Sequence, residues 1–152
     1  MKIAIGCDEA AYDLKVVVIE HLKEKNIEVD DFGAGKGETV LYPDVAIKVA
    51  EAIARGEYEK GILMCGTGIG MCITANKVPG IRAAVCHDPY SAERSRKSND
   101  AQIMCMGARV IGVELAKTLV DIWLGCDFSG GRSLPKIKRI SEYEKSRFSN
   151  PA

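Results

Sequence analysis

The hexapeptide CGTGIG at residues 65–70 places a cysteine directly before a glycine-rich run. Glycines leave backbone N–H groups uncovered, and a helix that starts here would add partial positive charge, so the run can bind a phosphate or an oxyanion. The same charge favours the thiolate of Cys65, which suits a base that removes a proton beside a carbonyl, with the loop stabilising the enediolate, or a nucleophile. Met71 stands where the dinucleotide fingerprint needs its third glycine, so nucleotide binding is not indicated. The alternative is that the glycines only permit tight packing between a strand and a helix.

Neither of the two histidines is placed to complete a cysteine–histidine pair. We expect His21 to be a solvated helix residue, whereas His87 follows an expected strand, so a catalytic part stays open. Two histidines and scattered thiols do not indicate a metal site. The six cysteines contain no C-x-x-C pair, and a domain of 152 residues needs no disulfides, so we expect reduced thiols.

A second candidate site lies near the C-terminus, where residues 132–147 hold six basic and two acidic side chains. Arg132 and Lys136 are four residues apart and would share one face of a helix. The pair could bind a phosphate, or the segment could be a solvated cationic helix end.

The composition excludes several classes of protein. With 47% apolar and 28% charged residues, the chain is typical of one globular domain, here residues 1–152. The 21 basic and 21 acidic residues balance, so binding to nucleic acid or to an anionic membrane is not expected. The apolar stretch Ile3–Ile5 is too short for a signal peptide or a membrane span, which predicts a cytoplasmic protein.

Strands and helices are expected to alternate along the chain. Apolar and β-branched runs predict strands, and apolar residues spaced three and four apart predict helices. The strands are expected at 2–7, 27–32, 60–65, 81–86 and 102–106, and the helices at 14–22, 43–54, 69–76, 89–97, 113–124 and 134–148. This pattern predicts an α/β fold, a three-layer, doubly wound, Rossmann-like parallel sheet with a C-terminal helix. We expect the common five-stranded order, 2-1-3-4-5. Ligands bind where strand order reverses, here between strands one and three, which would bring Asp8 beside residues 65–68.

Several motifs together resemble one known family. They are IGCDEA at 5–10, YPD at 42–44, GILMCGTGIGMCITANKVPGIRAA at 61–84, SNDAQIMCMGARVIG at 98–112 and GGRS at 130–133. They resemble the ribose-5-phosphate isomerase type B family, which includes the subunits of galactose-6-phosphate isomerase, over nearly the whole chain. The resemblance implies a homodimer or tetramer with active sites at subunit interfaces, no cofactor, and aldose–ketose interconversion of a small-molecule sugar phosphate through an enediolate.

The resemblance also implies roles for particular residues. Cys65 matches the base that moves a proton between C1 and C2, with Thr67 beside it. The loop amides that would hold the enediolate are those of Gly66, Gly68, Ile69 and Gly70. Asp8, Asn99 and Arg109 match positions that bind the sugar, and Arg132 and Lys136 match the pair that binds the phosphate.

Three departures from the family pattern bear on the substrate. Glu9 stands where a histidine normally helps to bind the substrate, and Ser98 stands where a histidine opens the furanose ring. Ser133 and Lys136 replace a histidine and an arginine, so a point charge takes the place of a bidentate guanidinium. Serine is a poor acid or base near neutral pH, so a ring-closed sugar would be handled badly.

Three hypotheses follow. The specificity has shifted to a sugar phosphate that is open-chain, as a four-carbon one must be. Alternatively, the chain is one subunit of a hetero-oligomer of the galactose-6-phosphate isomerase type, in which a partner supplies missing residues. A third possibility is a non-catalytic sugar-phosphate-binding protein, although such a protein has no need of a base at Cys65.

Overall fold

The computed structural model describes residues 1–148, so the last four residues of the domain expected over 1–152 lie outside it. Strands and helices alternate along the chain, as the sequence predicts. The strands are β1 (Lys2–Cys7), β2 (Glu28–Asp31), β3 (Lys60–Cys65), β4 (Ala83–Val85) and β5 (Ile103–Gly107). The helices are α1 (Tyr12–Glu24), α2 (Tyr42–Ala54), α3 (Ile69–Ala75), α4 (Pro89–Lys97), α5 (Val113–Leu124) and α6 (Leu134–Phe148), with short 3-10 turns η1 (Glu9–Ala11) and η2 (Gly131–Ser133).

The five strands form one parallel sheet in the order β2-β1-β3-β5-β4. The expected order 2-1-3-4-5 is therefore wrong at its last two positions, although the doubly wound α/β fold is confirmed. The reason lies in burial, because all residues of β5 are buried whereas the three residues of β4 are only partly buried. A strand buried on both faces belongs inside a parallel sheet, and a short, half-exposed strand suits its edge.

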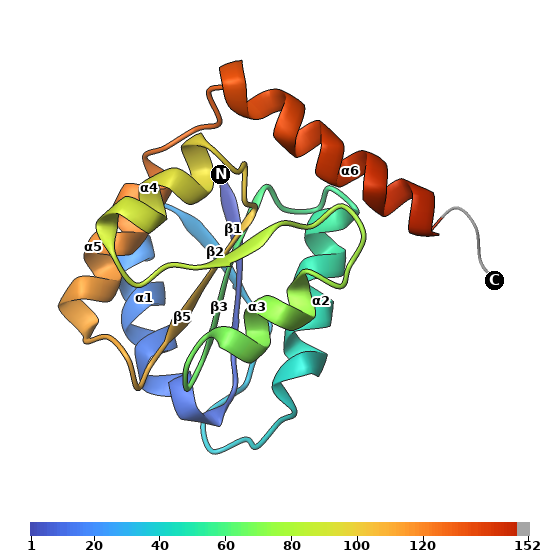
Figure 1. Cartoon of the computed structure of the whole chain (residues 1–152). Helices are drawn as coiled ribbons and strands as arrows, with labels where there is room; N and C mark the ends of the chain where they lie inside the picture. Colours follow the sequence, from blue (N-terminus) through green and yellow to red (C-terminus); the bar gives the residue numbers. More distant parts are fainter. Residues whose placement is uncertain (149–152) are drawn as a thin grey trace.

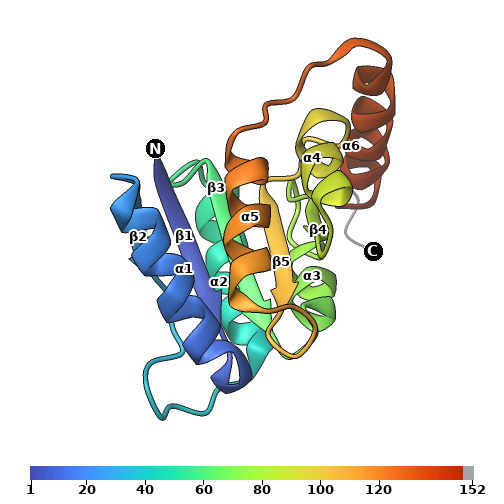
Figure 2. The same ribbon diagram turned by 90° about the vertical axis from the view of Figure 1, so that its left-hand side faces the viewer.

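Helices cover both faces of the sheet and so create two cores. Figure 1 shows α1, α4 and α5 on one side and α2 and α3 on the other, and Figure 2 views the first of these faces. Side chains alternate along each strand, so Met64 packs into the first core and Cys65 into the second. Cys65 thus faces the α2–α3 layer at the end of β3.

The helix layer also corrects one expectation. His21 is not a solvated residue, since its side chain is only 13% exposed and its Nε2 lies 2.7 Å from Oδ1 of Asp121. This contact joins α1 to α5 across the surface of the first core. Lys25 lies 3.3 Å from the same carboxylate oxygen.

The C-terminal helix α6 packs on the edge of the molecule with few buried side chains. It lies near the end of the sheet where the strands begin, opposite the end where they finish (Figure 1). Along the helix, Ile137 is the one buried side chain, and the Glu144 carboxylate accepts a hydrogen bond from the Gly80 N–H at 2.8 Å. No helix within residues 1–148 is both long enough and apolar enough to cross a membrane.

Candidate active site

The carboxyl ends of β1 and β3 meet at the point where strand order reverses, and a shallow depression of about 400 Å³ opens there. The Asp8 N–H donates to the Met64 carbonyl at 3.2 Å, which holds the ends of the two strands together. The lining residues come from four segments of the chain: Asp8, Tyr42, Cys65, Gly66, Thr67, Ile69, Gly70, Ile73 and Arg109. Seven of the residues singled out from the sequence therefore lie together.

The Cys65 thiol stands at the base of this depression. The residue is 6% exposed, and its Sγ accepts a hydrogen bond from the Gly68 N–H at 3.1 Å. The loop can turn back in this way because Gly68 has a φ of +78°, a conformation that favours glycine. The next amide, that of Ile69, donates to Oγ1 of Thr67 at 3.2 Å, so the amides at the start of α3 converge on the loop that follows Cys65.

The end of β5 fixes the position of the Cys65 loop. The Ala108 N–H donates to the Cys65 carbonyl at 2.9 Å, and the Arg109 N–H donates to the Gly66 carbonyl at 3.0 Å. A Cβ added to Gly107 would lie 2.6 Å from the Thr67 backbone, so the two chains touch without side chains between them. The Arg109 guanidinium lies over Gly66 and brings positive charge to the rim of the depression.

Asp8 contributes the negative charge of the site. Its Oδ1 accepts a hydrogen bond from the Ala10 N–H at 3.0 Å, which caps η1 and orients the carboxylate. Burial raises the pKa of the Asp8 carboxyl above its ordinary value, while the charge of Arg109 opposes that rise. The depression therefore combines a thiol, a carboxylate, a guanidinium and the amides of a helix N-terminus.

Glu9 has a different position from the one expected for a substrate-binding residue. It does not line the depression, and its carboxylate instead accepts a hydrogen bond from the Val40 N–H at 3.2 Å. This bond ties η1 to the exposed loop 35–41, which leads into Tyr42 at the start of α2. Glu9 thus contacts the loop that leads to the lining residue Tyr42, and not the depression itself.

The sequence assigns no role to two of the lining residues, Ile73 and Tyr42, although Tyr42 belongs to the YPD motif. The Tyr42 ring lies so close to Gly70 that a Cβ there would overlap it. The available signal was a tyrosine directly before Pro43, at the expected start of a helix, but nothing local links that position to Gly70. Ile73 lies one helical turn after Ile69 and is 57% exposed, which extends the apolar side of the site.

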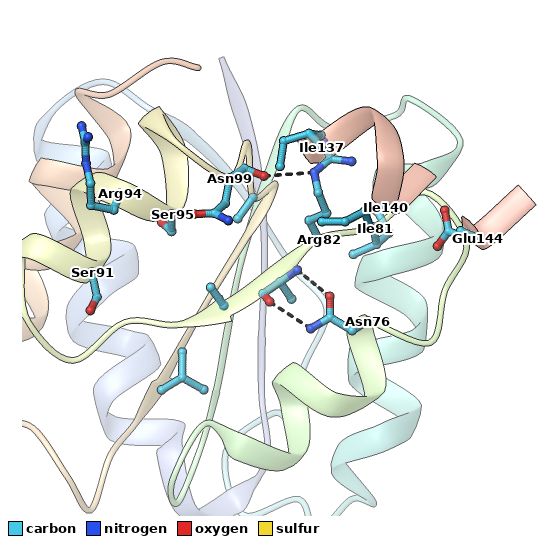
Figure 3. Close-up of a pocket in the computed structure, with 14 residues that line it drawn as sticks. Asn76, Ile81, Arg82, Ser91, Arg94, Ser95, Asn99, Ile137, Ile140 and Glu144 are labelled. Carbon is cyan, nitrogen blue, oxygen red and sulfur yellow. Dashed lines mark hydrogen bonds between the residues drawn. The ribbon is translucent and has the colours of Figure 1, made fainter. Parts of the chain in front are cut away.

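The remaining residues singled out from the sequence lie away from this depression. Asn99 lines a separate pocket of about 560 Å³ between β4, α4 and α6 (Figure 3). Ile137 and Ile140 of α6 line the same pocket. The Asn99 carbonyl accepts a hydrogen bond from Nε of Arg82 at 3.2 Å. Ser98, Arg132 and Lys136 line neither of these two pockets. Ser98 caps the end of α4, and the exposed Arg132 and Lys136 belong to η2 and α6.

The six cysteines, all within residues 1–148, are free thiols, and their surroundings differ. Burial raises the pKa of Cys7, Cys86 and Cys105. A hydrogen bond with Cys105 lowers the pKa of Cys72 to about 7. His87 lies outside the lining of the depression, and its Nε2 accepts a hydrogen bond from the Gly107 N–H at 2.9 Å.

The chain is similar to known proteins over nearly its whole length. A family model described as Ribose/Galactose Isomerase matches residues 3–140. Ribose-5-P isomerase B of Listeria innocua is 61% identical over 145 residues, which cover 95% of this chain and 98% of that protein. D-erythrulose-4-phosphate isomerase of Pectobacterium atrosepticum is 55% identical over 145 residues, covering 95% of each chain. The structure of Clostridium thermocellum ribose-5-phosphate isomerase B superposes with a TM-score of 0.94 at 50% identity, covering 97% of this chain and 99% of that one.

Proposed function

Because the chain belongs to the ribose/galactose isomerase family and is thus an aldose–ketose isomerase of sugar phosphates, we propose that Cys65 is its base and that its preferred substrate has four carbons. The observation that supports the base is the position of the Cys65 thiol. It lies at the base of a depression where an amide donates to its sulfur and the Arg109 guanidinium stands at the rim. A protein that only binds sugars has no need of a thiol at that point.

In the proposed reaction the Cys65 thiolate takes the proton from C2 of the aldose, and the electron pair of that C–H bond forms the C1–C2 double bond of an enediolate. The negative charge moves to O1, where backbone amides of the loop and Arg109 stabilise it. Cys65 then returns its proton to C1 while a proton passes from O2 to O1, which leaves the ketose. A thiol base needs a reducing compartment, so we place the enzyme in the cytoplasm, which suits its six free thiols.

Ser98, at the position where the family has its ring-opening histidine, favours a four-carbon substrate. A pentose 5-phosphate closes a furanose ring that must open before its C2 proton can leave, and a serine hydroxyl is a poor acid or base for that step. A four-carbon 4-phosphate cannot close the ring, because its O4 carries the phosphate. The relative from Pectobacterium atrosepticum, named for D-erythrulose 4-phosphate, supports this choice, whereas the name of the relative from Listeria innocua favours ribose 5-phosphate.

An aldose–ketose assay of the purified protein against tetrose, pentose and hexose phosphates tests both parts. We expect the tetrose phosphate to be turned over best, and Cys65→Ala to abolish both turnover and exchange of the C2 proton with solvent deuterium. Cys126→Ala, which removes a buried thiol outside the depression, is the matched control. Efficient turnover of ribose 5-phosphate with inert tetrose phosphates would overturn the substrate proposal. Substrate binding without any deuterium exchange would instead favour a sugar-phosphate-binding protein.

We also propose that the active enzyme is a symmetric dimer, or a tetramer built from such dimers. The site residues that the family resemblance implies form two separate groups on one chain. One group surrounds Cys65, and the other, which includes Asn99 and Arg132, lies around α4 and the start of α6. An interface between two identical copies can bring the first group of each chain against the second group of its partner. A hetero-oligomer would meet the same need with a second kind of chain.

Mixing two inactive variants tests this arrangement. If each site takes Cys65 from one chain and Asn99 from the other, a mixed dimer of Cys65→Ala and Asn99→Ala contains one intact site. Random exchange of subunits should then restore about a quarter of the wild-type activity. No recovery, although sedimentation shows that the subunits have exchanged, would place both residues in the site of a single chain. An inactive wild-type protein that gains activity from a second kind of chain would establish the hetero-oligomer.

A further inference from the structure

Beside the active site, the His87 side chain accepts a hydrogen bond from a β5 amide that lies beyond the end of the pairing between β4 and β5. Strand β4 pairs Ala83 with Ile103 and Val85 with Cys105, and continued by two residues this register would set the His87 backbone opposite Gly107. Strand β4 instead ends at Val85, and the chain turns into α4, whose cap Asp88 accepts the Ser91 N–H at 2.8 Å through its carboxylate. Nε2 of the His87 side chain takes the place of the absent strand and accepts the Gly107 N–H at 2.9 Å.

We propose that His87 is a positioning residue for Cys65, acting through Gly107 and the Thr67–Gly68 backbone. Gly107 is buried, so its N–H needs an acceptor within the protein. On its other side Gly107 packs directly against Thr67, since a Cβ there would lie 2.6 Å from the Thr67 Cα. A Cβ at Gly68 would lie 2.9 Å from the Met106 backbone, so the loop rests on β5 without a gap.

The geometry also determines the protonation state that this role needs. An imidazole accepts a hydrogen bond at Nε2 only when it is neutral with its proton on Nδ1. Burial lowers the pKa of His87 below its ordinary value, while the charge of the adjacent Asp88 opposes that shift. The neighbouring Cys86 has its pKa raised by burial and so stays neutral. On the β5 side, Gly107 and Ala108 carry no charge, and the Arg109 guanidinium lies over Gly66.

Protonation of His87 would therefore remove the acceptor and turn Nε2 into a donor that faces another donor. The Gly107 amide would lose its partner, and the backbone on which Thr67 rests would be free to shift. Because His87 does not line the depression, it acts on the proton-transfer step through the loop and not by contact with the sugar. The catalytic consequence rests on the proposed function, whereas the state of the imidazole and the protection of the Gly107 amide do not.

Two variants separate positioning from a general loss of stability. In His87→Gln the amide oxygen can reach the place of Nε2 and accept from Gly107 at any pH, so we expect kcat at pH 8 within about twofold of wild type. Below pH 6.5 its kcat should fall less steeply than that of the wild type. In His87→Leu the acceptor is lost, and we expect kcat to fall about tenfold to a hundredfold, the scale of a small displacement of a catalytic group, with KM little changed.

NMR provides readouts that do not depend on turnover. The wild-type imidazole should be the neutral Nδ1–H tautomer at neutral pH, and exchange of the Gly107 amide with solvent should be about tenfold faster or more in His87→Leu than in wild type and His87→Gln. A wild type that turns over no sugar phosphate would overturn the proposed function but leave these two expectations testable. Identical acid limbs in wild type and His87→Gln, or unchanged Gly107 exchange in His87→Leu, would overturn the role of His87.

Discussion

Gly107→Ala should impair both folding and catalysis, because it adds one methyl group at the point where β5 touches the Cys65 loop. The new Cβ would lie 2.6 Å from Cα and C of Thr67, whereas ordinary van der Waals contact begins at 3.4 Å. The two backbones would have to separate by about 0.8 Å, and neither can rotate out of the way as a flexible side chain can. Overpacking of this kind costs about 1–3 kcal/mol of stability, and a displacement near 1 Å in a catalytic loop can lower kcat by about a hundredfold.

Urea unfolding and initial-rate kinetics on the proposed substrate measure the two effects separately. Gly35→Ala is the matched control, because the nearest atom to its added Cβ is a carboxylate oxygen of Glu38 at 3.6 Å, and it should leave both quantities near wild type. Comparing kcat at urea concentrations where each protein is fully folded removes the contribution of unfolded enzyme. A Gly107→Ala protein with wild-type stability and wild-type kcat would show that the Thr67 backbone does not rest on Gly107.

Three further predictions concern charges and thiols. Burial raises the pKa of Asp8, so its ionisation should lower the stability of the folded protein as pH rises above the ordinary carboxyl pKa. Asp8→Asn should therefore raise Tm near pH 7 but not near pH 3, and it should weaken activity. With a pKa of about 7, Cys72 should react with iodoacetamide at pH 7 before Cys7, Cys86 and Cys105, whose pKa burial raises, and peptide mass spectrometry can rank these four thiols. Glu9→Ala should release the Val40 N–H and loosen the loop before Tyr42. In steady-state assays this change should raise KM more than it lowers kcat. Glu9→Gln keeps an acceptor for the Val40 N–H and should behave like wild type.

The elements could be predicted closely because their signals are local. The apolar run Lys60–Cys65 and the helices Pro89–Lys97 and Val113–Leu124 have the bounds expected from the sequence. The lateral order of the strands has no local signal, and the common five-stranded order 2-1-3-4-5 differs from the observed one at its last two strands. Burial decides it, since Ile103–Gly107 is wholly buried and Ala83–Val85 is not.

The candidate site also contains a part with local sequence signals and a part without them. Asp8 and residues 65–70 could be placed together because each directly follows a strand at the reversal of strand order. The partner of Glu9 could not be foreseen, because the Val40 N–H lies 31 residues away along the chain, in a loop without a regular pattern. The distance of Lys136 from Cys65 depends on where α6 packs, and the helical periodicity of residues 134–148 does not determine that.

The weak attachment of α6 to its own chain has a consequence for the enzyme at low concentration. The helix carries Lys136 on an element with one buried side chain, and it lies at the opposite end of the sheet from Cys65. If a neighbouring copy completes the site with this helix, then mass action decides how many sites are complete. Activity per milligram of protein should then fall on dilution below the dissociation constant of the dimer, and excess Cys65→Ala subunits, which lack a base but still carry α6, should restore it.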